Sequence, residues 1–199
     1  MRFPFLVALN HGSGVFSELP FMDDFIPLKR AVEATQIPSG TAVTLPEGTI
    51  ITITQSLGGS YTVHASTGGL YRIVSQDADA LGLEVAAQPT MTEGPFSEEL
   101  VWGALREVYD PEIPVNIVDL GLVYELSVEP VADSSEARKV TVKMTLTAPG
   151  CGMGPTLAAE ARQRISVLPG VAEADVILVW EPQWSPELIS PAGRAKLGI

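Results

Sequence analysis

We expect this chain to have an α+β fold, in which a small β-rich N-terminal domain precedes a compact α-β-β-α-β domain with a three-stranded sheet. Two observations predict it. The first half is rich in β-branched residues and glycine turns, which is typical of short antiparallel strands. The second half switches between helical spacing and strand-like alternation, which indicates helices packed on one sheet. With 46% hydrophobic residues among 199, the chain is long enough to bury a core.

The first half is predicted to form a β-meander or a small barrel. The glycine pairs Gly58-Gly59 and Gly68-Gly69 supply the positive φ angles that tight hairpins need. The core of this half is modest, so we expect it to lean on the second half. The strand candidates are residues 41–45, 49–55, 60–65 and 70–74.

The second half is predicted to contain two helices. Ser97 is a suitable N-cap, and the acidic residues that follow it suit the positive end of a helix dipole. Asp110-Pro111 is expected to end this first helix. A second helix opens at Pro155, a residue that favours the first helical turn, and Pro169-Gly170 stops it.

Three strands accompany these helices. Residues 122–128 and 140–147 alternate between apolar and polar side chains, which predicts strands buried on one face. Residues 176–180 form a continuous apolar run, which suits a strand covered on both faces.

A polar stretch broken twice by proline, residues 88–95, separates the two halves and is predicted to be a linker. At the start of the chain we expect a loosely ordered leader at 1–21, with Met22 as an alternative start. A β-rich domain at 22–87 follows, then the linker, an α/β domain at 96–180 and a tail at 181–199.

Charge and composition narrow the function. Acidic residues outnumber basic ones 24 to 12, and the net charge of −12 argues against a nucleic-acid partner. No apolar stretch approaches the length of a membrane span, so no membrane partner is expected. A single cysteine cannot form an internal disulfide, which fits a reducing compartment. The start of the chain does not look like a secretory signal, so we expect a cytoplasmic protein.

Cys151 is the only cysteine, and it lies in a glycine- and proline-rich loop at residues 148–155. The loop joins a predicted strand to a predicted helix, so the thiol lies near a helix N-terminus. Backbone N–H groups and the helix dipole favour a thiolate there. Most free cysteines are small buried hydrophobes, so a packing role stays open beside a functional one.

Two segments that precede this loop carry polar residues with the potential for chemistry. Three carboxylates, those of Asp110, Glu112 and Asp119, fall in an irregular segment that two prolines stiffen. A helix-ending turn at Asp110 and an Asx turn at Asp119 are the simpler interpretations. Thr145 and Thr147 share one strand face and lead into the cysteine loop, although ordinary β-propensity on a solvated face would also explain them.

A cysteine enzyme would need a base beside the thiol. The only histidines are His11, in the predicted leader, and His64, whose alternation with apolar neighbours predicts a solvent-facing side chain. A histidine-assisted nucleophile is therefore not expected, while a carboxylate-assisted one stays open.

Two long strings in the second half, residues 110–124 and 145–153, closely resemble the small α/β domain of iron–sulfur assembly factors. That domain is shared by bacterial SufT proteins, the eukaryotic cytosolic iron–sulfur targeting factor and the PaaD accessory protein of phenylacetyl-CoA oxygenation. Stretches of the first half, at 37–40, 53–63 and 77–82, and the tail from Trp180 onward are similar to SufT specifically. The resemblance covers residues 25–199.

The resemblance implies an accessory factor, not an enzyme, that helps to place iron–sulfur clusters in client proteins. Its partners would be the Suf assembly machinery and client apoproteins. Cys151 would be the functional thiol and a transient cluster ligand. The residues implied around it are Asp110, Glu112, Asp119, Thr145 and Thr147. A related scaffold domain uses a Cys-x-x-Cys pair, but here the second position is Gly154.

The number of thiols indicates that the chain transfers a cluster rather than storing one. A stable cluster normally needs four ligands, usually thiolates. One chain offers one, and a symmetric homodimer would offer two. Carboxylates are hard ligands that suit a sulfide-bridged cluster poorly. We therefore expect any bound iron–sulfur cluster to be labile and readily passed on; the oligomeric state stays open.

Two other functions are compatible with parts of the sequence. A non-catalytic adaptor between assembly machinery and clients would use the acidic surface and the aromatic residues Trp180 and Trp184, although tail packing on the protein's own core explains these tryptophans more simply. A PaaD-like oxygenase accessory role is disfavoured by the β-rich first half and the SufT-like tail.

Overall fold

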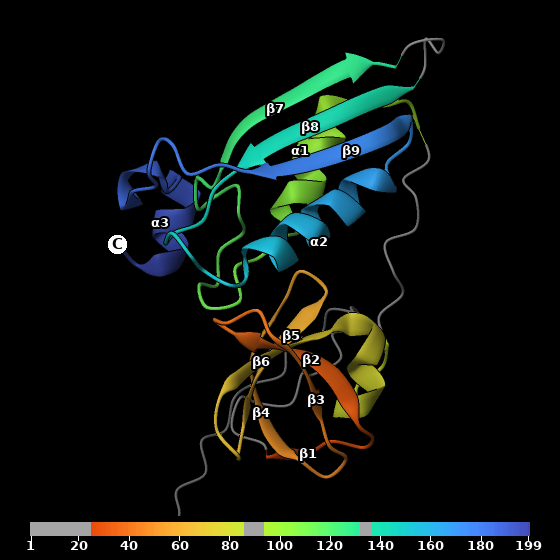
Figure 1. The fold of residues 1–199 in the computed structure, drawn as a ribbon, viewed down its shortest axis with the longest axis vertical. Coiled ribbons are helices and arrows are strands. Elements are labelled where there is room, and N and C mark those ends of the chain that lie inside the picture. Colours follow the sequence, from red (N-terminus) through yellow and green to blue (C-terminus); the bar gives the residue numbers. More distant parts are fainter. Residues whose placement is uncertain (1–24, 86–93, 132–136) are drawn as a thin grey trace, which may run out of the picture.

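The computed structural model describes residues 25–85, 94–131 and 137–199. The predicted leader and most of the predicted linker lie outside the described residues. The described chain forms a six-stranded sheet in its first half and a three-stranded sheet with helices in its second half (Figure 1). The predicted mixture of helices and sheets is confirmed.

The first sheet is antiparallel throughout, with the strand order β1-β4-β5-β6-β2-β3. Its consecutive neighbours β4, β5 and β6 form the predicted meander. Both glycine pairs in its hairpins, Gly58-Gly59 and Gly68-Gly69, have positive φ angles, as expected. The strands are β1 (Ile26–Pro27), β2 (Val32–Ile37), β3 (Ala42–Leu45), β4 (Ile50–Leu57), β5 (Ser60–Ala65) and β6 (Leu70–Val74).

Three elements of this half were not predicted. The strand β2 alternates buried Val32 and Ala34 with exposed Glu33, so its signal was present in the sequence. The strand β1 has two residues, too few for a period to show. The 3₁₀-helix η1 (Ser75–Leu81) follows β6 and ends at Gly82, which has a left-handed φ of 76°.

The second half has the predicted order of helices and strands: α1 (Glu98–Arg106), β7 (Val123–Pro130), β8 (Arg138–Met144), α2 (Gly154–Ser166) and β9 (Val171–Leu178). β8 is the central strand, antiparallel to β7 and parallel to β9. α1 and α2 lie against one face of this sheet (Figure 1). The Ser97 hydroxyl accepts a hydrogen bond from the backbone N–H of Leu100, which confirms the predicted N-cap of α1.

Two expectations for this half are wrong. β9 is an edge strand and is not covered on both faces: Ile177, within its apolar run, is 46% exposed. α1 ends at Arg106, before Asp110, because the chain turns there into an irregular loop.

Two hydrophobic clusters form the core, one in each half. Ile37, at the end of β2, belongs to the cluster of the second half, so the halves share apolar contacts as expected. None of the helices in the described ranges combines the length and the apolar character that crossing a bilayer requires.

The C-terminal tail folds back onto the second half. It contains the short 3₁₀-helix η2 (Pro186–Leu188) and the helix α3 (Pro191–Leu197). The indole N–H of Trp184 donates to the carbonyl oxygen of Leu120 at 2.8 Å. The simpler interpretation of Trp184, packing on the protein's own core, therefore holds, whereas Trp180 is 44% exposed.

Candidate functional site

Cys151 lies in the turn between β8 and α2. Its N–H donates to the carbonyl oxygen of Ala148 at 3.4 Å, and its own carbonyl accepts from the N–H of Gly154 at 3.2 Å. The side chain is half-buried and packs against the core cluster, while residues 148–150 are exposed. The thiol therefore lies at the border between core and solvent, beside the first turn of α2.

A turn of the N-terminal sheet touches this loop. A Cβ on Gly152 would overlap the carbonyl oxygen of Ser39, and a Cβ on Gly40 would overlap the carbonyl oxygen of Gly152. The β2–β3 turn and the cysteine loop thus approach backbone to backbone. Residue patterns alone did not predict this neighbour; the one signal was the SufT-like stretch at residues 37–40.

Asp110 is 8% exposed and shapes its own loop. One carboxylate oxygen accepts from the N–H groups of Glu112, at 2.8 Å, and Ile113, at 2.9 Å. Burial raises the pKa of the Asp110 carboxyl, and these two hydrogen bonds oppose that rise. Asp110 thus forms a local turn, while the side chain of Glu112 is exposed to solvent.

Asp119 joins the same loop to the C-terminal tail. Its carboxylate accepts from Asn116 Nδ2 at 2.8 Å and from the Ser190 hydroxyl at 2.9 Å, and Lys196 Nζ lies 3.5 Å away. Desolvation works to raise the pKa of Asp119, but these hydrogen bonds and the charge of Lys196 outweigh it, so the pKa lies below its usual value.

Thr145 and Thr147 lie beyond the end of β8, not within the strand. Thr145 is 1% exposed, so the solvated-face interpretation is wrong for it. Its N–H donates to the carbonyl oxygen of Leu122 at 2.8 Å, which joins the end of the Asp110–Asp119 loop to the segment that leads to Cys151. Thr147 is half-buried.

The structure therefore connects the two loops through their backbones. Within the described residues, no hydrogen bond joins Cys151 to any of the five polar candidates, and no group of three or more His, Cys, Asp or Glu side chains is placed to hold a metal ion. His64 is exposed on β5, as predicted. What the site offers chemically is one thiol, which can supply a single soft ligand to a metal centre.

The family comparison falls in the second half of the chain. Residues 98–176 match the family described as iron–sulfur cluster assembly protein. A Porphyromonas gingivalis protein named Fe-S protein maturation auxiliary factor is 40% identical over 103 residues, which are 52% of this chain and 92% of the relative. The Bacillus subtilis factor YitW is 37% identical over 102 residues, 51% of this chain and 94% of the relative.

A third relative is the Staphylococcus aureus factor SufT, 35% identical over 92 residues, 46% of this chain and 98% of the relative. Among solved structures, a domain of unknown function from Bacillus anthracis is 36% identical, covering 51% of this chain and 92% of its own, with a TM-score of 0.43. A Mycobacterium tuberculosis protein described as associated with Fe–S complex assembly and repair is 32% identical, covering 56% and 95%, with a TM-score of 0.31.

The matched segment is a small α/β domain, with helices on a three-stranded sheet and a half-buried thiol in the turn between β8 and α2. With identities of 35–40% across nearly the whole length of these relatives, the chain belongs to the iron–sulfur cluster assembly protein family, and it is of the SufT type.

Proposed function

We propose that this chain is an auxiliary factor in the maturation of iron–sulfur proteins, and that it passes a cluster to client proteins through Cys151. The observation that carries the proposal is the identity of 35–40% with relatives named Fe-S protein maturation auxiliary factors. The cluster is cargo in this proposal, not a resident cofactor.

The chemistry of the loop supports transfer rather than storage. Cys151 is half-buried at the border with solvent, so a partner can reach it. A cluster held by one thiolate of this chain must take its remaining ligands from elsewhere, because clusters usually bind four thiolates. Client cysteines or a second copy of the chain could supply them.

The partners in this proposal are the iron–sulfur assembly machinery and client apoproteins, and the chain acts by binding rather than by catalysis. We assign the β-rich sheet and the α/β part to two domains, residues 22–87 and 96–180, each with its own hydrophobic cluster.

An anaerobic pull-down tests the thiol. Wild type, Cys151→Ser and the control Ala148→Ser would be recovered from cells, and iron and sulfide measured on each. Ala148 is exposed in the same loop, so its variant adds the same hydroxyl without removing the thiol. We expect iron and sulfide to fall to background only for Cys151→Ser, because serine oxygen is a hard ligand for a sulfide-bridged cluster.

The adaptor alternative predicts a different result. If Cys151→Ser fully restores client-enzyme activity in cells that lack the factor, the thiol carries no cluster, and the chain acts as a bridge between proteins.

A further inference from the structure

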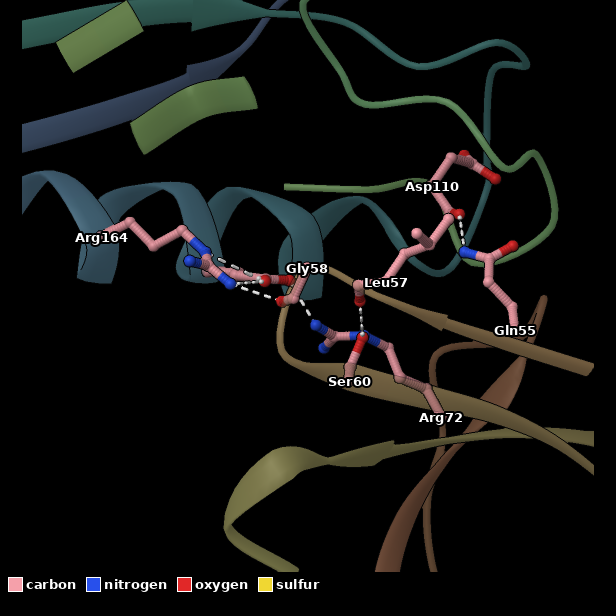
Figure 2. Close-up of polar contacts among 8 residues, drawn as sticks. Gln55, Leu57, Gly58, Ser60, Arg72, Asp110 and Arg164 are labelled. Carbon is pink, nitrogen blue, oxygen red and sulfur yellow. Dashed lines mark hydrogen bonds and ion pairs between the residues drawn. The ribbon is translucent and has the colours of Figure 1, made fainter. Parts of the chain in front are cut away.

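The N-terminal sheet lies directly against both loops of the candidate site. Gln55 Nε2, on β4, donates to the carbonyl oxygen of Asp110 at 3.0 Å (Figure 2). The Thr62 hydroxyl, on β5, donates to the carbonyl oxygen of Pro111 at 3.2 Å. The β2–β3 turn abuts Gly152, the residue after the thiol. One sheet therefore contacts the Asp110 loop and the Cys151 loop at the same time.

A buried ion pair joins the sheet to α2, the helix that follows the cysteine loop. Arg72, on β6, pairs with Glu160 of α2, and their side chains are 7% and 13% exposed. Arg164, one turn further along α2, also pairs with Glu160 and donates to the carbonyl oxygen of Gly58 (Figure 2). Desolvated charges are costly unless paired, so these contacts favour one arrangement of sheet and helix.

At the cysteine loop itself, backbone atoms of the two segments approach each other closely. At Gly40, with a φ of +71°, and at Gly152 a side chain would overlap a carbonyl group of the opposite segment. Gly58 is a third such position, since a Cβ there would overlap the carbonyl oxygen of Glu107. Backbone-to-backbone contact leaves the cysteine loop little room to shift, because interiors pack without voids to move into.

The match to the assembly family covers residues 98–176, so the N-terminal sheet lies outside it. From these contacts we infer that the sheet is a positioning module for the Cys151 loop, which holds the loop in one arrangement and limits access to the thiol. Gly40 and Gly152 are the positioning residues through which it acts. The inference deepens the proposed function and rests on it for its biological meaning.

Alkylation of Cys151 by iodoacetamide tests the inference on the purified full-length protein. Gly40→Ala forces the β2–β3 turn away from the cysteine loop. Gly48→Ala is the matched control, because Gly48 has a similar φ of +78° but open space around a new Cβ. Since Cys151 is the only cysteine, the alkylation rate reports on this site alone.

We expect Gly40→Ala to raise the alkylation rate several-fold, while Gly48→Ala reacts like the wild type. Equal rates for Gly40→Ala and the wild type would overturn the inference. It would also be overturned if Gly48→Ala reacted as fast as Gly40→Ala, because backbone strain alone would then explain the change.

A second pair of variants keeps the inference testable if Gly40→Ala does not fold. Arg72→Met breaks the interface from its other end and leaves Glu160 paired with Arg164. Arg30→Met is its control, because the ion pairs that Arg30 makes in the described part of the chain, with Asp77 and Asp79, lie within the N-terminal half. Faster alkylation in Arg72→Met alone supports the module, and unchanged alkylation in both contradicts it.

This readout is independent of cluster transfer. If Cys151→Ser supports client maturation fully, the proposed thiol function fails, whereas the alkylation rates still decide whether the sheet positions the loop. If the rates are unchanged but Cys151→Ser loses client maturation, the positioning module alone fails.

Discussion

At Asp110, burial and hydrogen bonding act on the same carboxyl group in opposite directions. Burial is the larger effect and raises its pKa above the usual 3.8. The folded protein therefore binds this proton more tightly than the unfolded chain does. Stability from this group is present at pH values below 3.8 and is lost as the pH rises through the folded-state pKa. Asp119 behaves in the opposite way, because its pKa is lowered.

We predict that Asp110→Asn changes the pH dependence of stability. Asparagine keeps an oxygen that accepts from the N–H groups of Glu112 and Ile113, but it carries no charge to desolvate. The free energy of unfolding of Asp110→Asn, relative to wild type, should therefore rise as the pH increases from below 3.8 towards neutrality. Urea unfolding across this range measures it.

Asp119→Asn is the control for this prediction, and the opposite sign is expected. Ionisation of the wild-type carboxylate strengthens its contacts with Ser190, Asn116 and Lys196 and so stabilises the fold. The free energy of unfolding of Asp119→Asn, relative to wild type, should therefore fall as the pH rises. A pH-independent difference for Asp110→Asn would show that its burial has no energetic consequence.

At the scale of elements, α3 is held by its first residues. The Ser190 hydroxyl accepts from the N–H of Gly193 at 3.0 Å as the N-cap of α3, and it donates to the Asp119 carboxylate. The N–H of Ser190 also donates to the carbonyl oxygen of Asp119 at 2.8 Å. One serine thus begins a helix and attaches the tail to the Asp110–Asp119 loop.

Ser190→Ala is expected to lower the free energy of unfolding by more than the loss of an ordinary N-cap does. Removing the cap costs about 1 kcal/mol, and a hydrogen bond to a charged group adds about 1.5 kcal/mol. Ser97→Ala is the matched control, because Ser97 caps α1 and its hydroxyl makes no hydrogen bond to a carboxylate within the described residues; a loss of about 1 kcal/mol is expected. Chemical denaturation of both variants measures the difference in their free energies of unfolding. Equal losses in the two variants would show that the hydrogen bond from Ser190 to Asp119 adds no stability.

At the scale of the whole molecule, two hydrophobic clusters are joined by the contacts of Gly40, Gln55 and Arg72. Ile37 extends from the first sheet into the cluster of the second half. Buried contacts of this kind couple the stabilities of the parts that share them, so the two halves should unfold in one transition.

Ile51→Ala tests this coupling. Ile51 is fully buried in the cluster of the first half, and its truncation should cost about 3 kcal/mol. All three tryptophans, Trp102, Trp180 and Trp184, lie in the second half and report on it by fluorescence. We expect the midpoint of unfolding measured by fluorescence to fall by as much as the midpoint measured by circular dichroism. A fluorescence midpoint that stays at the wild-type value would mean that the halves unfold independently.

Features decided by a few neighbouring residues were predicted well. The N-cap at Ser97, the glycine hairpins and the order of helices and strands all follow from local propensity and periodicity. Features that depend on residues far away in the sequence were not predicted. The burial of Thr145 and the exposure of Ile177 depend on which segments pack beside them, and a run of apolar residues cannot reveal that β9 is an edge strand.

By itself the sequence determined the family, the order of the elements and the position of a lone thiol between a strand and a helix, because short-range patterns and motif strings encode these. Only the tertiary structure decided that the N-terminal sheet packs on the cysteine loop and that Asp119 anchors the tail. The physical reason is that backbone contacts such as Gly40 with Gly152, and an ion pair such as Arg72 with Glu160, join residues far apart in the chain and leave no periodic trace along it.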